Sequence, residues 1–231
     1  MSRSPSPARS LRRITGGAAL VAFPAVLVVQ GPLDPTTGGG AEALYDAASR
    51  QSGALAASAL LLLLSGVLMA PAAGAVLHQA RDRGAALANI GAVLAVLGGF
   101  GHAAIAMLQI LGSALPGGDR SELLAYVERI DQRPLVLGAV FPLIMSFGLA
   151  LLLLSWAAWR SGQIALWGPV SVTVIVVAHL VLPEDMPVVP VIGLLVLAVV
   201  FGRLGVRVLR MSDAEWDGLP RTAPSPEPVR A

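Results

Sequence analysis

The chain has 231 residues, of which 55% belong to the hydrophobic set and 13% are charged. Soluble domains carry about 25% charged residues, so this composition excludes a disordered protein, a coiled coil and an ordinary soluble enzyme. All 16 basic residues are arginine, and cysteine is absent, which excludes disulfides, thiolate metal sites and cysteine nucleophiles. The arginines lie between apolar runs and not on one soluble segment, so we expect no nucleic-acid partner.

Six uncharged runs alternate with the charged residues: 14–33, 51–80, 84–118, 134–159, 161–183 and 186–202. A membrane-spanning helix needs about 20 apolar residues. Continuous apolar stretches such as 60–64 also differ from the alternating strands of membrane barrels. We therefore predict an all-α polytopic transmembrane helical bundle, with the lipid bilayer as its partner. Its six helices are expected at 14–30, 53–77, 86–112, 134–158, 164–182 and 187–208.

The placement of arginine predicts the orientation of this bundle. With the N-terminus inside, twelve arginines face the cytoplasm and only Arg50, Arg120, Arg129 and Arg133 face outward. The sequence thus predicts a multi-pass protein of the cytoplasmic membrane with both termini cytoplasmic. Residues 1–13 form a basic cytoplasmic start, 14–208 the transmembrane domain, and 209–231 a disordered, proline-rich cytoplasmic tail. The basic start also resembles a signal peptide, which remains an alternative.

Two segments between the spans are more than connectors. Residues 119–131 begin with an Asp119 cap, and Leu123, Leu124, Val127 and Ile130 follow at helical spacing, which predicts a short amphipathic helix on the outer surface. The stretch AEALYDAASRQ, beginning at Ala41, predicts a second one, with Leu44, Tyr45 and Ala48 on one side.

A shift of 77 residues aligns two parts of the chain. It pairs Arg83 with Arg160, Ala88 with Ala165, Gly91 with Gly168, Val93 with Val170 and His102 with His179. The arginine, glycine and histidine pairs carry most of this signal, because apolar residues match easily by chance. The second and third helices therefore resemble the fourth and fifth, as in a parallel repeat with a pseudo-two-fold axis along the membrane normal.

His102 and His179 are the ionisable side chains deepest in the predicted spans. Gly91 and Gly168 share their helix faces, and on the third helix that face continues through Gly98 to Gln109. One interpretation is a hydrogen bond from each imidazole to a neighbouring helix. A second is a shared haem b or metal centre, with Gly98, Gly99 and Gly101 lining the space for the macrocycle. A third is a proton pathway, although carrier relays usually contain an acidic residue within a span. In each case we expect both rings to face protein.

The arrangement resembles a group of uncharacterised bacterial six-span membrane proteins classed as a domain of unknown function. The resemblance rests on LRRITGGAAL, GGFGHAAIAMLQ, VFPLIMSFGLALLLL and VVAHLVLP, and it covers residues 10–210. It implies six spans and no known activity, and it carries over no catalytic residue.

The expected function follows from these patterns. Motifs such as H-E-x-x-H, G-x-S-x-G and the P-loop are absent, so no catalytic residue is assigned. We expect an integral membrane protein of non-enzymatic role (a subunit, a stabiliser or a small-ligand sensor) without a cofactor. The alternative is a haem- or metal-binding redox protein that uses His102 and His179. A small-solute or proton-coupled carrier comes third.

Overall fold

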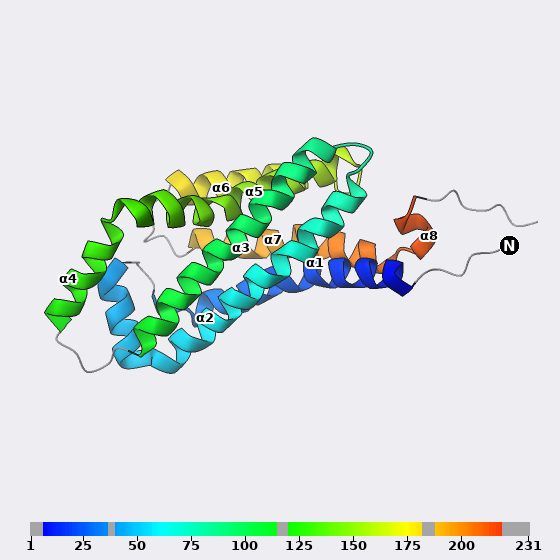
Figure 1. Ribbon diagram of the computed structural model, residues 1–231. Helices are drawn as coiled ribbons and strands as arrows, with labels where there is room; N and C mark the ends of the chain where they lie inside the picture. The colour runs from blue at the N-terminus through cyan, green and yellow to red at the C-terminus, as the bar shows by residue number, and fades with distance from the viewer. Residues whose placement is uncertain (1–6, 37–39, 115–119, 182–187, 219–231) are drawn as a thin grey trace, which may run out of the picture.

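The computed structural model describes residues 7–36, 40–114, 120–181 and 188–218, which fold almost entirely into helices (Figure 1). No strand occurs within those four ranges, so the all-α prediction is confirmed for them. In chain order the elements are α1 (Pro7–Leu33), α2 (Gly40–Gln79), α3 (Ala85–Ser113), α4 (Arg120–Asp131), the π-helix η1 (Val136–Val140), α5 (Phe141–Arg160), α6 (Trp167–Val181), α7 (Val188–Arg210) and α8 (Asp213–Trp216).

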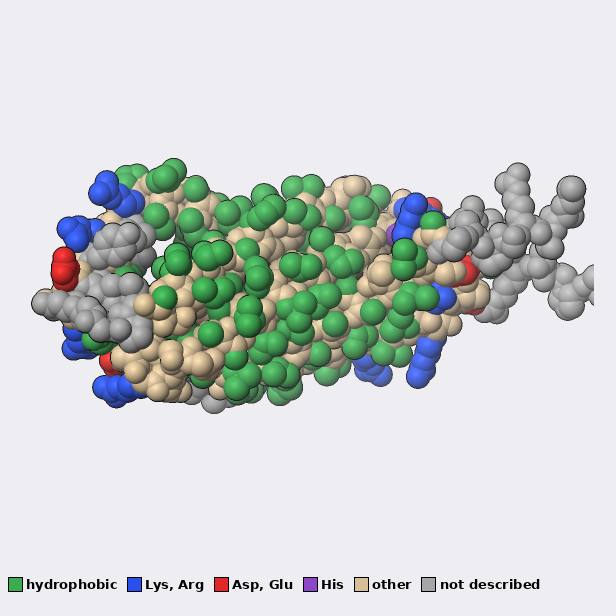
Figure 2. Space-filling model, turned by 60° about the horizontal axis from the view of Figure 1, so that its bottom comes forward, with side chains coloured by type: hydrophobic (Ala, Val, Ile, Leu, Met, Phe, Trp, Pro, Cys, Tyr) green, Lys and Arg blue, Asp and Glu red, His purple; other side chains and the backbone are tan. Residues whose placement is uncertain are grey.

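Five segments are long and apolar enough to cross a membrane. They are Ser10–Leu33, Gly40–Gln79, Ala85–Ser113, Gly138–Arg160 and Pro190–Arg210. Many of their large apolar side chains are exposed, and Figure 2 shows such side chains along the middle of the bundle with arginines at both ends. An apolar belt of this extent is expected only where lipid replaces water. The chain is therefore a membrane protein with several spans.

The predicted helix at 164–182 is α6, which is apolar but has only 15 residues. At 1.5 Å per residue it is about 22 Å long, shorter than a hydrocarbon core of about 30 Å. The helix begins at Trp167, and Pro169 lies in its first turn, where a missing N–H costs no helical hydrogen bond. Six full spans are thus not confirmed.

Packing follows the chain order only in part. Helix α1 packs against α2 and α7, α2 against α3, and α3 against α5, while α6 contacts α5 and α7 more sparsely. Alanines fill much of this core, including Ala59, Ala95, Ala106 and Ala150, and small residues allow helix axes to approach closely. The α2–α3 pair is packed far more extensively than the α5–α6 pair, so the structure does not confirm the predicted repeat.

Both ends of the described chain meet at one end of the bundle, here called the α8 end (Figure 1). Arg13 in α1 donates from Nε to Asp213 Oδ1 at 2.9 Å, and Ser10 donates to Asp213 Oδ2 at 2.5 Å. His78 at the end of α2 stacks on the Trp216 ring with centroids 4.2 Å apart, and its Nε2 lies 2.9 Å from the Trp216 carbonyl oxygen. Helix α1 therefore begins, and helix α8 ends, at the same end of the bundle.

Asp213 gives this junction a pH dependence. The hydrogen bonds from Ser10 and then from Arg13 hold the pKa of the Asp213 carboxyl below its usual value of about 3.9. Because the folded-state pKa is lowered, the contribution to stability is present above the usual value and is lost as the pH falls through the folded value. We expect Asp213→Asn to lower the melting temperature at about pH 6, and this difference to shrink toward about pH 3. A difference that is equal at both pH values would contradict this assignment.

The two segments predicted to be amphipathic helices form a helical cap at the opposite end, here called the α4 end. Residues 120–131 are helical as predicted. Val127 is buried, and Glu122 and Arg129 are exposed. Asp119 and the side chains of Leu123 and Ile130 lie outside the described residues. The second predicted segment is the start of α2, which bends at Gln51. Its residues Ala47 and Ala48 are buried with Leu55, and Leu44 packs against them.

Arg120 joins the two parts of this cap. Its guanidinium lies 3.5 Å from the Glu42 carboxylate and 5.7 Å from the centroid of the Tyr45 ring. At the α8 end, Ser212 and Glu215 cap α8 reciprocally. The prediction of a disordered tail over 209–231 is wrong for its first part, because residues 209–218 include the end of α7 and the whole of α8. Residues 219–231 lie outside the described residues.

Candidate functional site: a polar seam between the first three helices

His102 is buried in α3 between α2 and α5. Its Nδ1 lies 2.9 Å from Ser65 Oγ in α2, and its ring packs against Phe147 in α5 with centroids 4.3 Å apart. Ser65 Oγ also lies 2.7 Å from the Leu62 carbonyl oxygen, which can only accept. A tautomer of His102 with its proton on Nδ1 lets both hydrogen bonds form at once. The predicted interhelical hydrogen bond is confirmed for this histidine.

The glycines beside His102 bring helices into contact and leave no gap. A Cβ added at Gly98 would lie 2.7 Å from the Cα atom of Phe147, and one at Gly101 would lie 2.8 Å from the carbonyl group of Leu143. On the other side, a Cβ at Gly99 would lie 2.8 Å from the carbonyl oxygen of Gly66. The expectation that Gly98, Gly99 and Gly101 line space for a macrocycle is wrong, because the α5 and α2 backbones occupy that space.

His179 does not join His102. It is exposed near the end of α6, a helix that contacts α5 and α7. The expectation that both rings face protein is thus confirmed for His102 and wrong for His179. In the described part of the chain, no group of three or more His, Cys, Asp or Glu residues is arranged to hold a metal ion. A centre shared by the two histidines would require these packed helices to rearrange.

A second group of polar side chains lies two helical turns from His102, toward the α4 end. Ser58 is seven residues before Ser65, and Gln109 is seven residues after His102, so both pairs share helix faces. Gln30 of α1 donates from Nε2 to Ser58 Oγ at 2.9 Å and to Asp34 Oδ2 at 3.0 Å. Gln109 donates from Nε2 to the same Asp34 oxygen at 3.2 Å. Gln30, Asp34, Ser58 and Gln109 are called the outer cluster below, a name that refers to the α4 end.

Asp34 is the acceptor that ties this cluster together. Its Oδ1 accepts from the backbone N–H and the hydroxyl of Thr36, at 3.0 and 2.6 Å. Its Oδ2 accepts from the two glutamines on α1 and α3, so one carboxylate joins two helices directly and α2 through Ser58. Within the described residues its hydrogen bonds come from neutral groups and not from a cation.

Gln109 presents an unsatisfied acceptor next to this carboxylate. Its side chain is 4% exposed, and its Oε1 atom is buried with no hydrogen-bond donor among the described residues. The amide cannot simply be reversed, because its NH2 group is the one that donates to Asp34. A buried acceptor without a donor costs about 1–3 kcal/mol. An N–H or O–H group, from water or from a small ligand, would satisfy this acceptor.

Sequence reasoning did not select Asp34 or Gln30. Asp34 directly follows the first apolar run, a position that is typical of an acidic residue in a connecting loop. One signal was present, because Gln109 continues the face of α3 that carries Gly98 and His102. Comparison with protein-family models, curated proteins and solved structures finds no match for the chain, and the family resemblance therefore stays a prediction.

Proposed function

We propose that this chain is a non-enzymatic integral membrane protein that senses a small ammonium-type cation at the outer cluster. The observation that carries the proposal is the buried Gln109 Oε1 atom, which has no described donor and belongs to the amide bonded to Asp34. An ammonium group supplies the N–H donor that this oxygen lacks and is attracted by the adjacent carboxylate. The polar side chains of the seam bond to one another and to the backbone, which supports a binding role over a catalytic one.

The position of the cluster supports sensing as the consequence of binding. Asp34 and its partners connect α1, α2 and α3 beneath the helical cap. Gly112, three residues after Gln109, lies against Leu44 of that cap, since a Cβ there would meet Leu44 Cδ1 at 3.1 Å. A ligand that changes the bonds of Gln109 thereby acts on the end of α3 and on the cap packed against it.

Methylammonium chloride is a direct probe for this site. Titrated against the purified protein at constant ionic strength, it is expected to raise the melting temperature of the wild type. A ligand at about a hundredfold above its dissociation constant stabilises the folded state by about 2.7 kcal/mol. Sodium chloride has no N–H donor and should give a smaller shift.

Two variants make this titration decisive. Asp34→Asn removes the charge of the site and should abolish the methylammonium shift. Asp46→Asn removes a carboxylate of the cap that lies 4.0 Å from the Arg50 guanidinium, and it should keep the shift. Equal shifts for sodium and methylammonium, or for both variants and the wild type, would reject the proposed site.

We also propose the orientation in which the α8 end is cytoplasmic and the α4 end faces outward, in the cytoplasmic membrane. Within the described ranges nine arginines are near the α8 end, and Arg50, Arg120, Arg129 and Arg133 are near the α4 end. Arginine is enriched on the cytoplasmic side of bacterial and other multi-pass proteins. Under this orientation the outer cluster receives its ligand from outside the cell.

The absence of cysteine allows a clean test of this orientation. Ala114 and Arg83 are exposed at opposite ends of α3. With a membrane-impermeant maleimide, Ala114→Cys should be labelled in intact cells, and Arg83→Cys only after permeabilisation. The reverse pattern would overturn the orientation, and with it the outward position of the cluster.

A further inference from the structure

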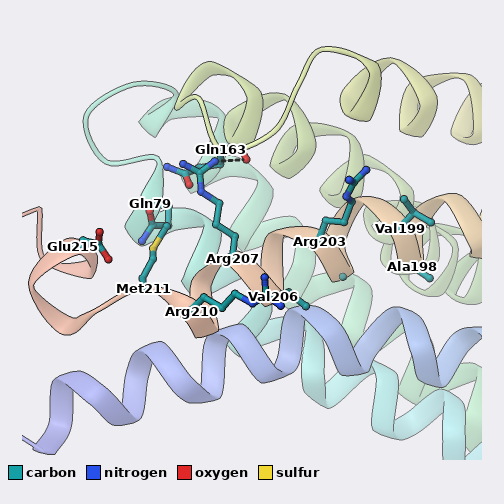
Figure 3. Close-up of a pocket in the computed structure, with 11 residues that line it drawn as sticks. Gln79, Gln163, Ala198, Val199, Arg203, Val206, Arg207, Arg210, Met211 and Glu215 are labelled. Carbon is teal, nitrogen blue, oxygen red and sulfur yellow. Dashed lines mark hydrogen bonds between the residues drawn. The ribbon is translucent and has the colours of Figure 1, made fainter.

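A groove of about 920 Å³ opens at the α8 end, far from the outer cluster (Figure 3). Helix α7 forms its floor, and the end of α2 and the α5–α6 connection form its rim. The residues that carry the argument are Arg203, Arg207, Arg210, Val199, Val206 and Gln163. The three arginines follow one another at spacings of four and three residues, which places them on one face of α7.

Arg207 is fixed in place by the backbone at the rim. Gly162 has a φ of +74°, and the N–H of Gln163 bonds to the Ala158 carbonyl while that of Gly162 bonds to the Trp159 carbonyl. This is the usual glycine-dependent end of a helix, and it turns the next carbonyls toward α7. Arg207 donates to the carbonyl oxygens of Gly162 and Gln163 at 3.3 and 2.8 Å. These two bonds hold the Arg207 side chain against the rim of the groove.

Arg203 and Arg210 lie on either side of Arg207 along α7, and both side chains are exposed. Across the described ranges, no carboxylate lies within 4.0 Å of the guanidinium of Arg203, Arg207 or Arg210. Glu215 also lines the groove, but its carboxylate accepts from the backbone N–H of Ser212 at 2.9 Å in the cap of α8. The three guanidinium groups repel one another at this spacing. Binding of an anion in the groove would therefore be favourable.

The other half of the groove is apolar. Val199 and Val206 line it with exposed fractions of 48% and 39%, and Ala198 lies beside them. Ile192 and Leu195 are exposed on the same helix, so the groove is continuous with the apolar surface of α7. A free anion uses only the arginine half, whereas an amphiphile uses both.

We propose that this groove binds an anionic phospholipid, whose phosphate headgroup contacts Arg203 and Arg210 and whose acyl chain lies along Val199 and Val206. Guanidinium groups bind phosphate oxygens in bidentate fashion. Basic pockets at the cytoplasmic ends of membrane helices are suited to such headgroups. The site is independent of the cation proposed at the outer cluster and involves none of its residues.

Native mass spectrometry of the purified full-length protein tests the proposal. The ligands are phosphatidylglycerol, phosphatidylcholine and inorganic phosphate, each titrated separately. We expect phosphatidylglycerol to bind most tightly. An arginine near an anionic headgroup contributes about fivefold in affinity, so Arg203→Gln/Arg210→Gln should weaken phosphatidylglycerol binding about 25-fold.

The matched control is Arg83→Gln/Arg160→Gln, which removes two exposed arginines from the same end of the bundle but outside the groove. It should leave the affinity within about twofold of the wild type. Arg203→Lys/Arg210→Lys keeps the charges and should lose less than the glutamine pair, which also shows that a loss does not reflect misfolding. Equal losses in the glutamine pair and the control would overturn the site. So would phosphatidylcholine binding as tightly as phosphatidylglycerol. Phosphate binding as tightly as the lipid would identify a free-anion site instead and contradict the lipid proposal.

Discussion

Gly98→Leu is expected to lower the free energy of unfolding by about 3 kcal/mol, the upper range for overpacking a well-packed core. Even a Cβ at residue 98 would lie 2.7 Å from the Cα atom of Phe147 and 2.8 Å from its backbone nitrogen. These are backbone atoms of a facing helix, so a side-chain rotation cannot relieve the clash. The α3–α5 contact must open, and the packing of Phe147 on His102 is lost with it. Unfolding by sodium dodecyl sulfate, followed by circular dichroism in mixed micelles, measures the difference.

Gly74→Leu is the matched control for this substitution. Gly74 lies in α2 with no neighbouring atom within 4 Å of an added Cβ, so the same change in helix propensity occurs there without a clash. Replacing a helical glycine at such a position should be neutral or stabilising by up to about 1 kcal/mol. Equal destabilisation by both substitutions would show that the close α3–α5 contact does not determine stability.

Asp34→Ala is expected to cost about 1–3 kcal/mol, because it leaves the buried Nε2 group of Gln109 without its acceptor. Gln30 is affected less, since it keeps its bond to Ser58. The same unfolding assay should show a change of no more than about 1 kcal/mol for Asp46→Ala, which removes an exposed ion pair.

A double-mutant cycle separates this bond from other effects of Asp34. If the cost comes from the orphaned amide, Gln109→Leu should be much less harmful in the Asp34→Ala background than in the wild type. Additive effects of the two substitutions would place the energetic role of Asp34 elsewhere, for example in its bonds to Thr36.

The helices could be predicted because hydropathy and charge act locally along the chain. The apolar runs around Leu20 and Leu151 needed only their own composition to indicate membrane helices. The short helix that begins at Arg120 was indicated by its Asp119 cap and by apolar spacing. The contact of Arg120 with Glu42 could not be predicted, because it depends on how two segments meet at the α4 end.

The polar contacts of the site are nonlocal, which is why the sequence left them open. Asp34 and Gln109 are 75 residues apart, and Arg13 and Asp213 are 200 residues apart. Each pair is brought together by the order in which helices pack, and hydropathy does not specify that order. Asp34 lies just beyond an apolar run, so a search for acids within spans passes over it.

The glycine face of α3 was ambiguous for a different reason. A row of small residues on a helix predicts that another group packs closely against it, and that group can be a flat ligand or another helix. The structure places the backbones of Phe147 and Leu143 there. The same limit applies to His179, since periodicity gives the face of a helix and not what covers it. Helix α6 has few neighbours, and the ring is exposed.

Hydrogen exchange in lipid nanodiscs tests whether the outer cluster binds a ligand. Exchange of peptides covering residues 28–36 and 105–114 is compared with and without methylammonium chloride at constant ionic strength. We expect slower exchange in both peptides of the wild type, because the ligand completes the bonds of Gln109 and stiffens α1 and α3 together. Gln109→Met has nearly the same shape but no acceptor, and it should show no change. Exchange that methylammonium leaves unaltered in the wild type, or slows equally in Gln109→Met, would contradict ligand binding at the outer cluster.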